Sequence, residues 1–204
     1  MLIIVIASMI FFGITHSYTA GQFKNVFRSR FGDRAYYGLY RVFYNLFAVI
    51  TLVPISYLFA RQPGNVIWRI DLRWEPVLMA IQFVGLVGLV ISLLQIDLGR
   101  FLGITQLFAY FRGKPLPLSK EELQVHGLYA FVRHPLYLFS MLATWPVMTM
   151  TEAYLGFCVG MTIYFIVGSL YEERRLVATF EQSYAEYQRR VPWLIPFLRR
   201  GNKT

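Results

Sequence analysis

The sequence predicts an all-α integral membrane protein with about five transmembrane helices in one domain, residues 1–204. Of its 204 residues, 56% are hydrophobic and only 15% are charged, whereas soluble domains carry about a quarter charged residues. A soluble fold of this size has too much surface for its volume to bury so many apolar side chains. Because the apolar residues also gather into segments of helical membrane-span length, a bilayer is the expected surrounding medium.

Five apolar segments are expected to form the helices: residues 2–15, 39–60, 76–96, 135–150 and 153–171. The first segment is short for a full span, so its helix is expected to run on to Phe23, to lie tilted or to be partly re-entrant. No basic residue precedes Lys24, which favours a retained helix over a cleaved signal peptide. The fourth and fifth segments are separated only by Thr151 and Glu152, which predicts a helical hairpin. The domain thus divides into three N-terminal helices (1–96) and a C-terminal part (97–204).

The basic residues predict the orientation of the chain. The net charge is +9, but most lysines and arginines lie in the first gap, in the gap after the third segment and in the tail from Arg174 to Lys203. The remaining gap carries Arg61, Arg69 and Arg73. By the positive-inside rule the N-terminus is outside, and the long loop and the tail are cytoplasmic. The expected partner of the charge is the membrane lipid bilayer, and no nucleic acid is expected.

Two polar stretches are expected to lie outside the apolar helices. Residues 97–133 contain several glycines and prolines among apolar residues, which predicts a functional loop with short interfacial helices. From Glu172 to Arg190, Leu176, Phe180 and Tyr184 recur at helical spacing. This pattern predicts an amphipathic C-terminal helix that leaves the membrane.

A first candidate site lies where the loop enters the fourth segment. Pro135 suits the first turn of a helix, whose N–H groups attract an anion, and Arg133 before it suits a carboxylate. His134 offers a donor and an acceptor, and the rings of Tyr129 and Tyr137 suit a cation or a heteroaromatic base. The alternative is a positive-inside anchor with interfacial aromatic residues.

A second candidate site is the pair Glu172 and Glu173 at the end of the fifth segment. Carboxylates at a membrane boundary are costly unless they are paired or functional. The alternative is a local ion pair with Arg174, Arg175 or Arg133. If the last two helices are antiparallel neighbours, both glutamates lie close to the first candidate site.

These residues resemble the isoprenylcysteine carboxyl methyltransferases and their relatives, which include phospholipid methyltransferases, methanethiol S-methyltransferases and NnrU-type proteins. Three stretches in the first half, 15–17, 36–45 and 97–106, are similar to the methanethiol methyltransferase and NnrU side. The C-terminal signature occurs in order and spacing at Gly127, Tyr129, Arg133, His134, Pro135, Tyr137, Glu172, Glu173, Leu176, Phe180, Tyr184, Tyr187, Val191, Pro192 and Pro196.

The resemblance implies an S-adenosylmethionine site without a Rossmann fold. Glu172 would pair the ammonium group of the cofactor and Arg133 its carboxylate, and Glu173 would be a further cofactor-binding residue. The isoprenylcysteine enzymes have a substrate-recognising arginine where this chain has Gly168, which argues against a prenylcysteine substrate. Candidates for a general base are His16 and His126, and no metal is expected. The other residues that would line the cofactor pocket are Leu123, Gln124, Tyr129, His134, Pro135, Leu136 and Tyr137.

The predicted function is an S-adenosylmethionine-dependent membrane methyltransferase that acts on a lipophilic or small thiol or carboxylate acceptor. One alternative is an NnrU-like membrane factor without enzymatic activity. Another is a membrane reductase with a nicotinamide cofactor, although the sequence contains no dinucleotide fingerprint.

Overall fold

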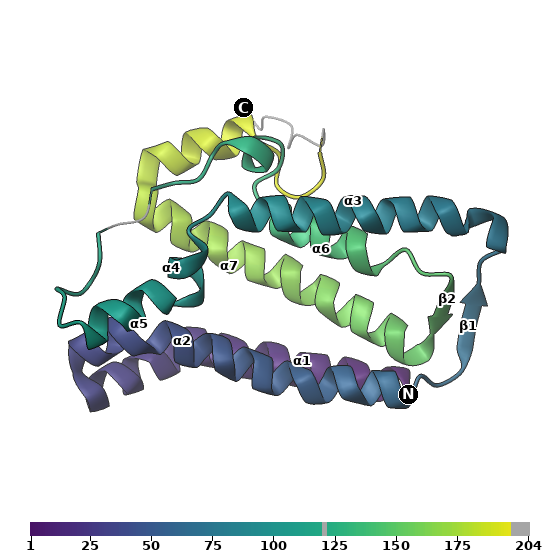
Figure 1. Ribbon diagram of the computed structural model, residues 1–204, viewed down its shortest axis with the longest axis horizontal. Coiled ribbons are helices and arrows are strands. Elements are labelled where there is room, and N and C mark those ends of the chain that lie inside the picture. The colour runs from purple at the N-terminus through teal and green to yellow at the C-terminus, as the bar shows by residue number, and fades with distance from the viewer. Residues whose placement is uncertain (120–121, 197–204) are drawn as a thin grey trace. The chain divides into compact units, whose positions relative to one another are not determined.

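The computed structural model describes residues 1–119 and 122–196, which are mainly helical (Figure 1). These residues form two compact units whose segments alternate along the sequence. The described residues of unit 1 are 1–65, 97–119 and 151–160, and those of unit 2 are 66–96, 122–150 and 161–196. A single domain divided after residue 96 stays a prediction.

Unit 1 is built around two long helices. Helix α1 (Leu2–Tyr18) passes through a π-helical turn (Thr19–Phe23) directly into α2 (Lys24–Arg61). The helical path therefore runs on to Phe23, one of the alternatives that the sequence left open. The helical geometry of α2 is interrupted at Gly32, whose φ of +79° is a backbone conformation that glycine adopts easily. After this turn, the rest of α2 packs along α1 (Figure 1). Two short helices, α4 (Leu98–Leu102) and α5 (Ile104–Phe111), pack against α2.

Unit 2 contains α3 (Glu75–Leu94), α6 (Pro135–Thr144) and most of α7 (Glu152–Arg190), and α3 packs along α6. Short 3-10 turns lie at Leu72–Trp74 and Gly127–Ala130. Glycines permit the close contact of the two helices: a Cβ on Gly85 would lie 2.4 Å from the backbone nitrogen of Ala143. Such small residues are typical of helix interfaces in membranes.

The connection between α6 and α7 corrects the all-α prediction. Helix α6 ends at Thr144, and residues Thr149–Thr151 form a strand, β2, that pairs with β1 (Val66–Arg69). Pro146 has no N–H group to continue the helical ladder. The β-branched Thr149 and Thr151 then suit an extended conformation. The predicted helix over 135–150 is therefore shorter, and the predicted hairpin includes an extended segment.

Three helical stretches of the described chain are long and apolar enough to cross a membrane: Leu2–Arg61, Leu72–Leu94 and Glu152–Arg190. Many large apolar side chains on them are exposed, as expected for helices surrounded by lipid. The chain is therefore a membrane protein. Helix α6 is apolar but has only ten residues, so five spans stay a prediction, as does the orientation. The basic tail from residue 197 lies outside the described residues.

The C-terminal amphipathic segment is the last part of α7, not a separate helix from Glu172. Glu181, with φ +48° and ψ −120°, interrupts the helical geometry, and the chain changes direction there (Figure 1). We call residues 182–196, which follow this turn, the C-terminal arm. Tyr184, Tyr187 and Val191 of the arm are buried and pack against Leu123 and other apolar side chains.

Candidate functional site

The start of α6 is held by the C-terminal arm. Pro135 occupies the first turn of α6 and is fully buried, a position where its missing N–H costs nothing. The backbone N–H of Arg133 donates to the carbonyl of Pro192 at 3.0 Å, and that of His134 donates to the carbonyl of Trp193 at 3.3 Å. The Arg133-His134-Pro135 motif is thus fixed by main-chain hydrogen bonds to the C-terminal arm.

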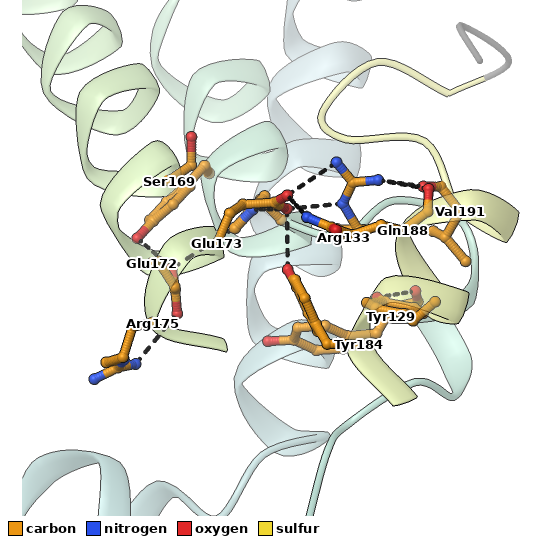
Figure 2. A network of polar contacts seen from close by, with 12 residues as sticks. Tyr129, Arg133, Ser169, Glu172, Glu173, Arg175, Tyr184, Gln188 and Val191 are labelled. Atoms are coloured by element: carbon orange, nitrogen blue, oxygen red, sulfur yellow. Dashed lines mark hydrogen bonds and ion pairs between the residues drawn. The ribbon is translucent and has the colours of Figure 1, made fainter. Parts of the chain in front are cut away.

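Glu173 is the centre of a polar network (Figure 2). Its carboxylate accepts from Arg133 Nε at 2.7 Å and from Arg133 Nη2 at 3.1 Å. Tyr184 donates its hydroxyl proton at 3.0 Å and Gln188 Nε2 donates at 2.5 Å, while His134 Nε2 lies 2.9 Å from Oε1. Among the described residues, four side chains thus use both oxygens of this carboxylate, which leaves it little capacity for a ligand.

The guanidinium of Arg133 is hydrogen-bonded almost as fully as the carboxylate of Glu173. Besides the two bonds to Glu173, Nη1 donates to the carbonyls of Gln188 at 3.0 Å and Val191 at 2.8 Å. The side chains of Arg133 and Glu173 are only 9% and 12% exposed. Forked ion pairs of this kind are strong and directional. We call Arg133, His134, Glu173, Tyr184 and Gln188 the clamp, because together they hold the arm to the start of α6.

Glu172, the neighbouring residue, has a different environment. Its side chain is 34% exposed, and Arg175 Nη2 lies 3.8 Å from Oε1. Tyr137 donates its hydroxyl proton to Oε2 at 3.0 Å, and His134 Nδ1 lies 3.7 Å from the same oxygen. The carboxylate of Glu172 is therefore reachable from solvent and can accept further hydrogen bonds, whereas that of Glu173 in the clamp is buried and already fully used.

Aromatic residues lie close to Glu172. The ring of Tyr137 stacks with the ring of His134 and with that of Phe165, with centroid distances of 5.4 and 4.8 Å. Burial raises the pKa of Tyr129, and the negative charge of Glu172 adds to this effect. The Tyr129 hydroxyl therefore stays protonated and able to donate. We call Glu172, Tyr129 and Tyr137 the rim.

The structure brings together most of the residues that the sequence singled out. Leu123 packs against the buried tyrosines of the arm, and Gln124 and Leu136 are half-buried in the same unit. His126 is exposed just before the 3-10 turn. His16 lies in α1 and belongs to unit 1.

Two residues of unit 2 were not expected to shape this site. Gln188 joins the clamp only because the chain turns at Glu181, and the sequence has no signal for that turn. Gln95 at the end of α3 accepts from the backbone N–H of Leu128 at 2.9 Å and so holds the turn that carries Tyr129. Gly127, with φ +63°, allows this close approach, since a Cβ added at this position would lie 2.2 Å from Gln95 Nε2.

The fold and the site define a helical membrane protein with a preassembled charge network beside an accessible carboxylate. The family described as NnrU protein matches residues 4–195 of this chain. The chain therefore belongs to the NnrU protein family. No solved structure matches it significantly.

Curated relatives extend this result. Methanethiol S-methyltransferase 1 of Bradyrhizobium diazoefficiens is 33% identical over 194 residues, which cover 94% of this chain and 65% of that protein. Methanethiol S-methyltransferase of Mycobacterium tuberculosis is 32% identical over 190 residues, 91% of this chain and 74% of that protein. Nurim of Xenopus laevis is 31% identical over 106 residues, 50% of this chain and 37% of that protein. The chain thus spans just under two thirds of the first relative's length.

Proposed function

We propose that this chain is a membrane methyltransferase that uses S-adenosylmethionine, with the rim as the cofactor site. The observation that carries the proposal is the accessible carboxylate of Glu172 beside a fully engaged clamp. A methyl donor of this kind combines an ammonium group, a carboxylate, a sulfonium and an adenine ring. The rim fits three of these features, because it offers one anion and several aromatic faces.

Glu172, Tyr137 and the rings next to them have distinct proposed tasks. Glu172 pairs the ammonium group of the cofactor, and Tyr137 orients that carboxylate through its hydroxyl group at 3.0 Å. The cofactor supplies an electrophilic methyl group on a sulfonium. The stacked rings of His134, Tyr137 and Phe165 exclude water and stabilise positive charge next to their faces. Leu123, Gln124, Pro135 and Leu136 complete the proposed lining.

The clamp has a supporting task in this proposal. The sequence analysis assigned the cofactor carboxylate to Arg133, but four of its N–H groups already bind Glu173, Gln188 and Val191. We therefore assign Arg133 and Glu173 to holding the arm in place and not to direct contact with the carboxylate. Preorganisation of this kind lowers the cost of aligning the reactants.

The acceptor is proposed to be a small thiol. Two relatives are named for S-methylation of methanethiol. Position 168, one turn before Glu172, is a glycine around which a Cβ would meet no described atom within 4 Å, so this position itself supplies no cation for a carboxylate. The lipophilic and carboxylate acceptors that the sequence also allowed rank below the thiol.

The test is cofactor binding by the purified full chain. Calorimetry should show S-adenosylmethionine binding to the wild type and at least tenfold weaker binding to Glu172→Gln, because the ammonium loses its counter-charge. Glu186→Gln is the matched control: Glu186 is exposed and pairs only with Arg190 at 3.7 Å among the described residues. Equal affinity of wild type and Glu172→Gln would contradict the rim assignment.

A second candidate is a membrane factor without enzymatic activity, an alternative that the family description and the match to Nurim leave open. Under that candidate the wild type binds no S-adenosylmethionine at all. Binding of NADPH in its place would indicate the reductase that the sequence analysis also considered.

A further inference from the structure

A cavity with two basic side chains lies beside α5 in unit 1, and neither the clamp nor the rim includes any of its residues. The cavity has a volume of about 270 Å³ and is lined by α5 and by the chain that follows this helix. Its wall is mainly apolar, but the side chains of Arg112 and Lys114 also line it. Cations in an apolar wall favour a ligand that has both an anionic and an apolar part.

The turn after α5 fixes the main chain that carries the two cations. The backbone N–H of Lys114 donates to the carbonyl of Ala109 at 2.9 Å. Gly113 between the cations has a φ of +69°, a conformation that glycine adopts easily. The guanidinium of Arg112 lies over the ring of Phe108, 5.6 Å from the ring centroid. A guanidinium held on an aromatic ring keeps its planar fork of N–H groups for an anion.

Among the described residues of unit 1, no carboxylate neutralises Arg112 or Lys114. The three acidic residues described there pair elsewhere: Asp33 with Arg28 at 2.6 Å, Asp97 with Arg100 at 3.2 Å, and Glu152 with the N-terminal amine at 3.3 Å. Both cations of the cavity are exposed. The cavity therefore keeps a positive charge that an anion from outside can reach.

The cavity lies where unit 1 changes from apolar to basic. Helix α5 packs against α2 (Figure 1), which belongs to a stretch long and apolar enough to cross a membrane. Arg34 of α2 donates to the carbonyls of Tyr110 and Lys114 at 2.9 and 3.1 Å. The first eleven residues of α2 carry four basic side chains: Lys24, Arg28, Arg30 and Arg34. Basic residues beside an apolar span lie at the depth of the lipid headgroups.

The exposed side of α5 extends the apolar wall. Phe108 lines the cavity and is 55% exposed, and Phe111 at the end of the helix is 73% exposed. A helix with exposed aromatic side chains and adjacent basic residues lies in the interface of a membrane. An acyl chain that begins in the cavity can thus continue along apolar side chains towards the membrane core.

We propose that this cavity binds the headgroup phosphate of an anionic phospholipid. Arg112 donates to the phosphate oxygens, and Lys114 supplies a second positive charge. Phe108 and Leu118 contact the glycerol backbone and the first carbons of an acyl chain. Ligand pockets have about 300–1,000 Å³, so a cavity of about 270 Å³ suits a headgroup and not a whole lipid. The site does not depend on the proposed methyltransferase function.

The test titrates the purified full chain in detergent with phosphatidylglycerol and measures the bound fraction by native mass spectrometry. The wild type should bind this lipid more tightly than the zwitterionic phosphatidylcholine. The double variant Arg112→Gln, Lys114→Gln should bind it about 25-fold more weakly, because each basic residue at a membrane surface contributes about fivefold. The matched control, Arg30→Gln with Arg61→Gln, removes the same charge from exposed positions of unit 1 outside the cavity lining and should leave the affinity almost unchanged.

A second pair of variants tests the cavity apart from its charge. Thr105 is exposed and lines the cavity, so Thr105→Trp should fill the space and weaken phosphatidylglycerol binding although both cations remain. Phe111→Trp, at an exposed position of α5 outside the lining, should bind as the wild type does. Circular dichroism checks that each variant keeps its helices.

Four outcomes overturn the proposal. Equal affinity of the wild type for the two lipids would show that the headgroup charge is not recognised. Equal weakening in the two double variants would assign the effect to net charge and not to the cavity. Unchanged binding by Thr105→Trp would place the lipid elsewhere. Displacement of the lipid by inorganic phosphate alone would indicate a site for a soluble anion.

Discussion

The clamp and the rim differ in how deeply their central carboxylates are buried and in how fully these are hydrogen-bonded, although the two glutamates are adjacent in sequence. Glu173 is 12% exposed and both of its oxygens are occupied, while Glu172 is 34% exposed and accepts from Tyr137. Successive residues on a helix point about 100° apart. Glu173 therefore faces Arg133 and the arm, whereas Glu172 faces Tyr137 and solvent. The comparison teaches that one acidic pair combines a structural residue with a residue open to ligand.

The largest expected effect is on stability, at the centre of the clamp. Glu173→Ala leaves the buried guanidinium of Arg133 without its counter-charge, which should lower the free energy of unfolding by about 3–5 kcal/mol. Thermal unfolding in detergent measures this loss. Glu172→Ala is the matched variant and should cost about 1 kcal/mol. Equal losses for the two variants would contradict the distinction between clamp and rim.

Arg133→Lys should have the next largest effect. Lysine keeps the charge but has no planar fork, so it cannot bind both oxygens of Glu173 and two carbonyls at once. We expect a loss of about 2 kcal/mol in unfolding free energy and faster proteolysis within the arm, residues 182–196. Arg175→Lys, on the exposed side of α7, should be neutral by both measurements. A fully stable Arg133→Lys would show that charge alone holds the arm.

Tyr184→Phe removes one hydroxyl donor from the clamp and leaves the ring in the apolar cluster with Tyr187 and Val191. The expected cost is about 1 kcal/mol, the usual net value of one hydrogen bond. Differential scanning calorimetry measures it, with Tyr171→Phe, at an exposed position, as the control. A loss above that of Arg133→Lys would place the main support of the arm in Tyr184.

The smallest expected effect concerns the rim at alkaline pH. Burial and then Glu172 raise the pKa of Tyr129, so the folded chain holds this proton at a pH where the unfolded chain loses it. The stability linked to Tyr129 is therefore complete below the ordinary tyrosine pKa of about 10 and decreases as the pH rises above it. Ultraviolet difference titration of wild type against Tyr129→Phe measures the ionisation. Ionisation of Tyr129 in the ordinary range would mean that the rim is more open than described.

Much of the fold was predictable because lipid-facing helices are marked by composition. Helices occur at all five predicted segments, since long apolar runs have few other ways to satisfy their backbone in a membrane. The strand β2 was not predicted, because it needs β1, about eighty residues earlier, as its partner. The turn at Glu181 was not predicted either, since a glutamate rarely adopts a positive φ and only the packing of the arm maintains it.

The residues of the candidate site were visible in the sequence, but their division of tasks was not. Arg133, His134, Glu172 and Glu173 were singled out by charge at a membrane boundary. Their pairing depends on which helix faces meet, and Gln188 enters only when the arm returns to α6.

By itself, the sequence determined that the chain is a helical membrane protein with a charged motif at the start of α6 and an acidic pair on α7. These features depend on local composition and spacing, which the amino-acid order states directly. Only the tertiary structure decided that Glu173 is buried in the clamp, that Glu172 remains accessible in the rim, and that His16 pairs with Tyr44. Each of these depends on contacts between residues distant in sequence, because burial and hydrogen-bond saturation are properties of packing.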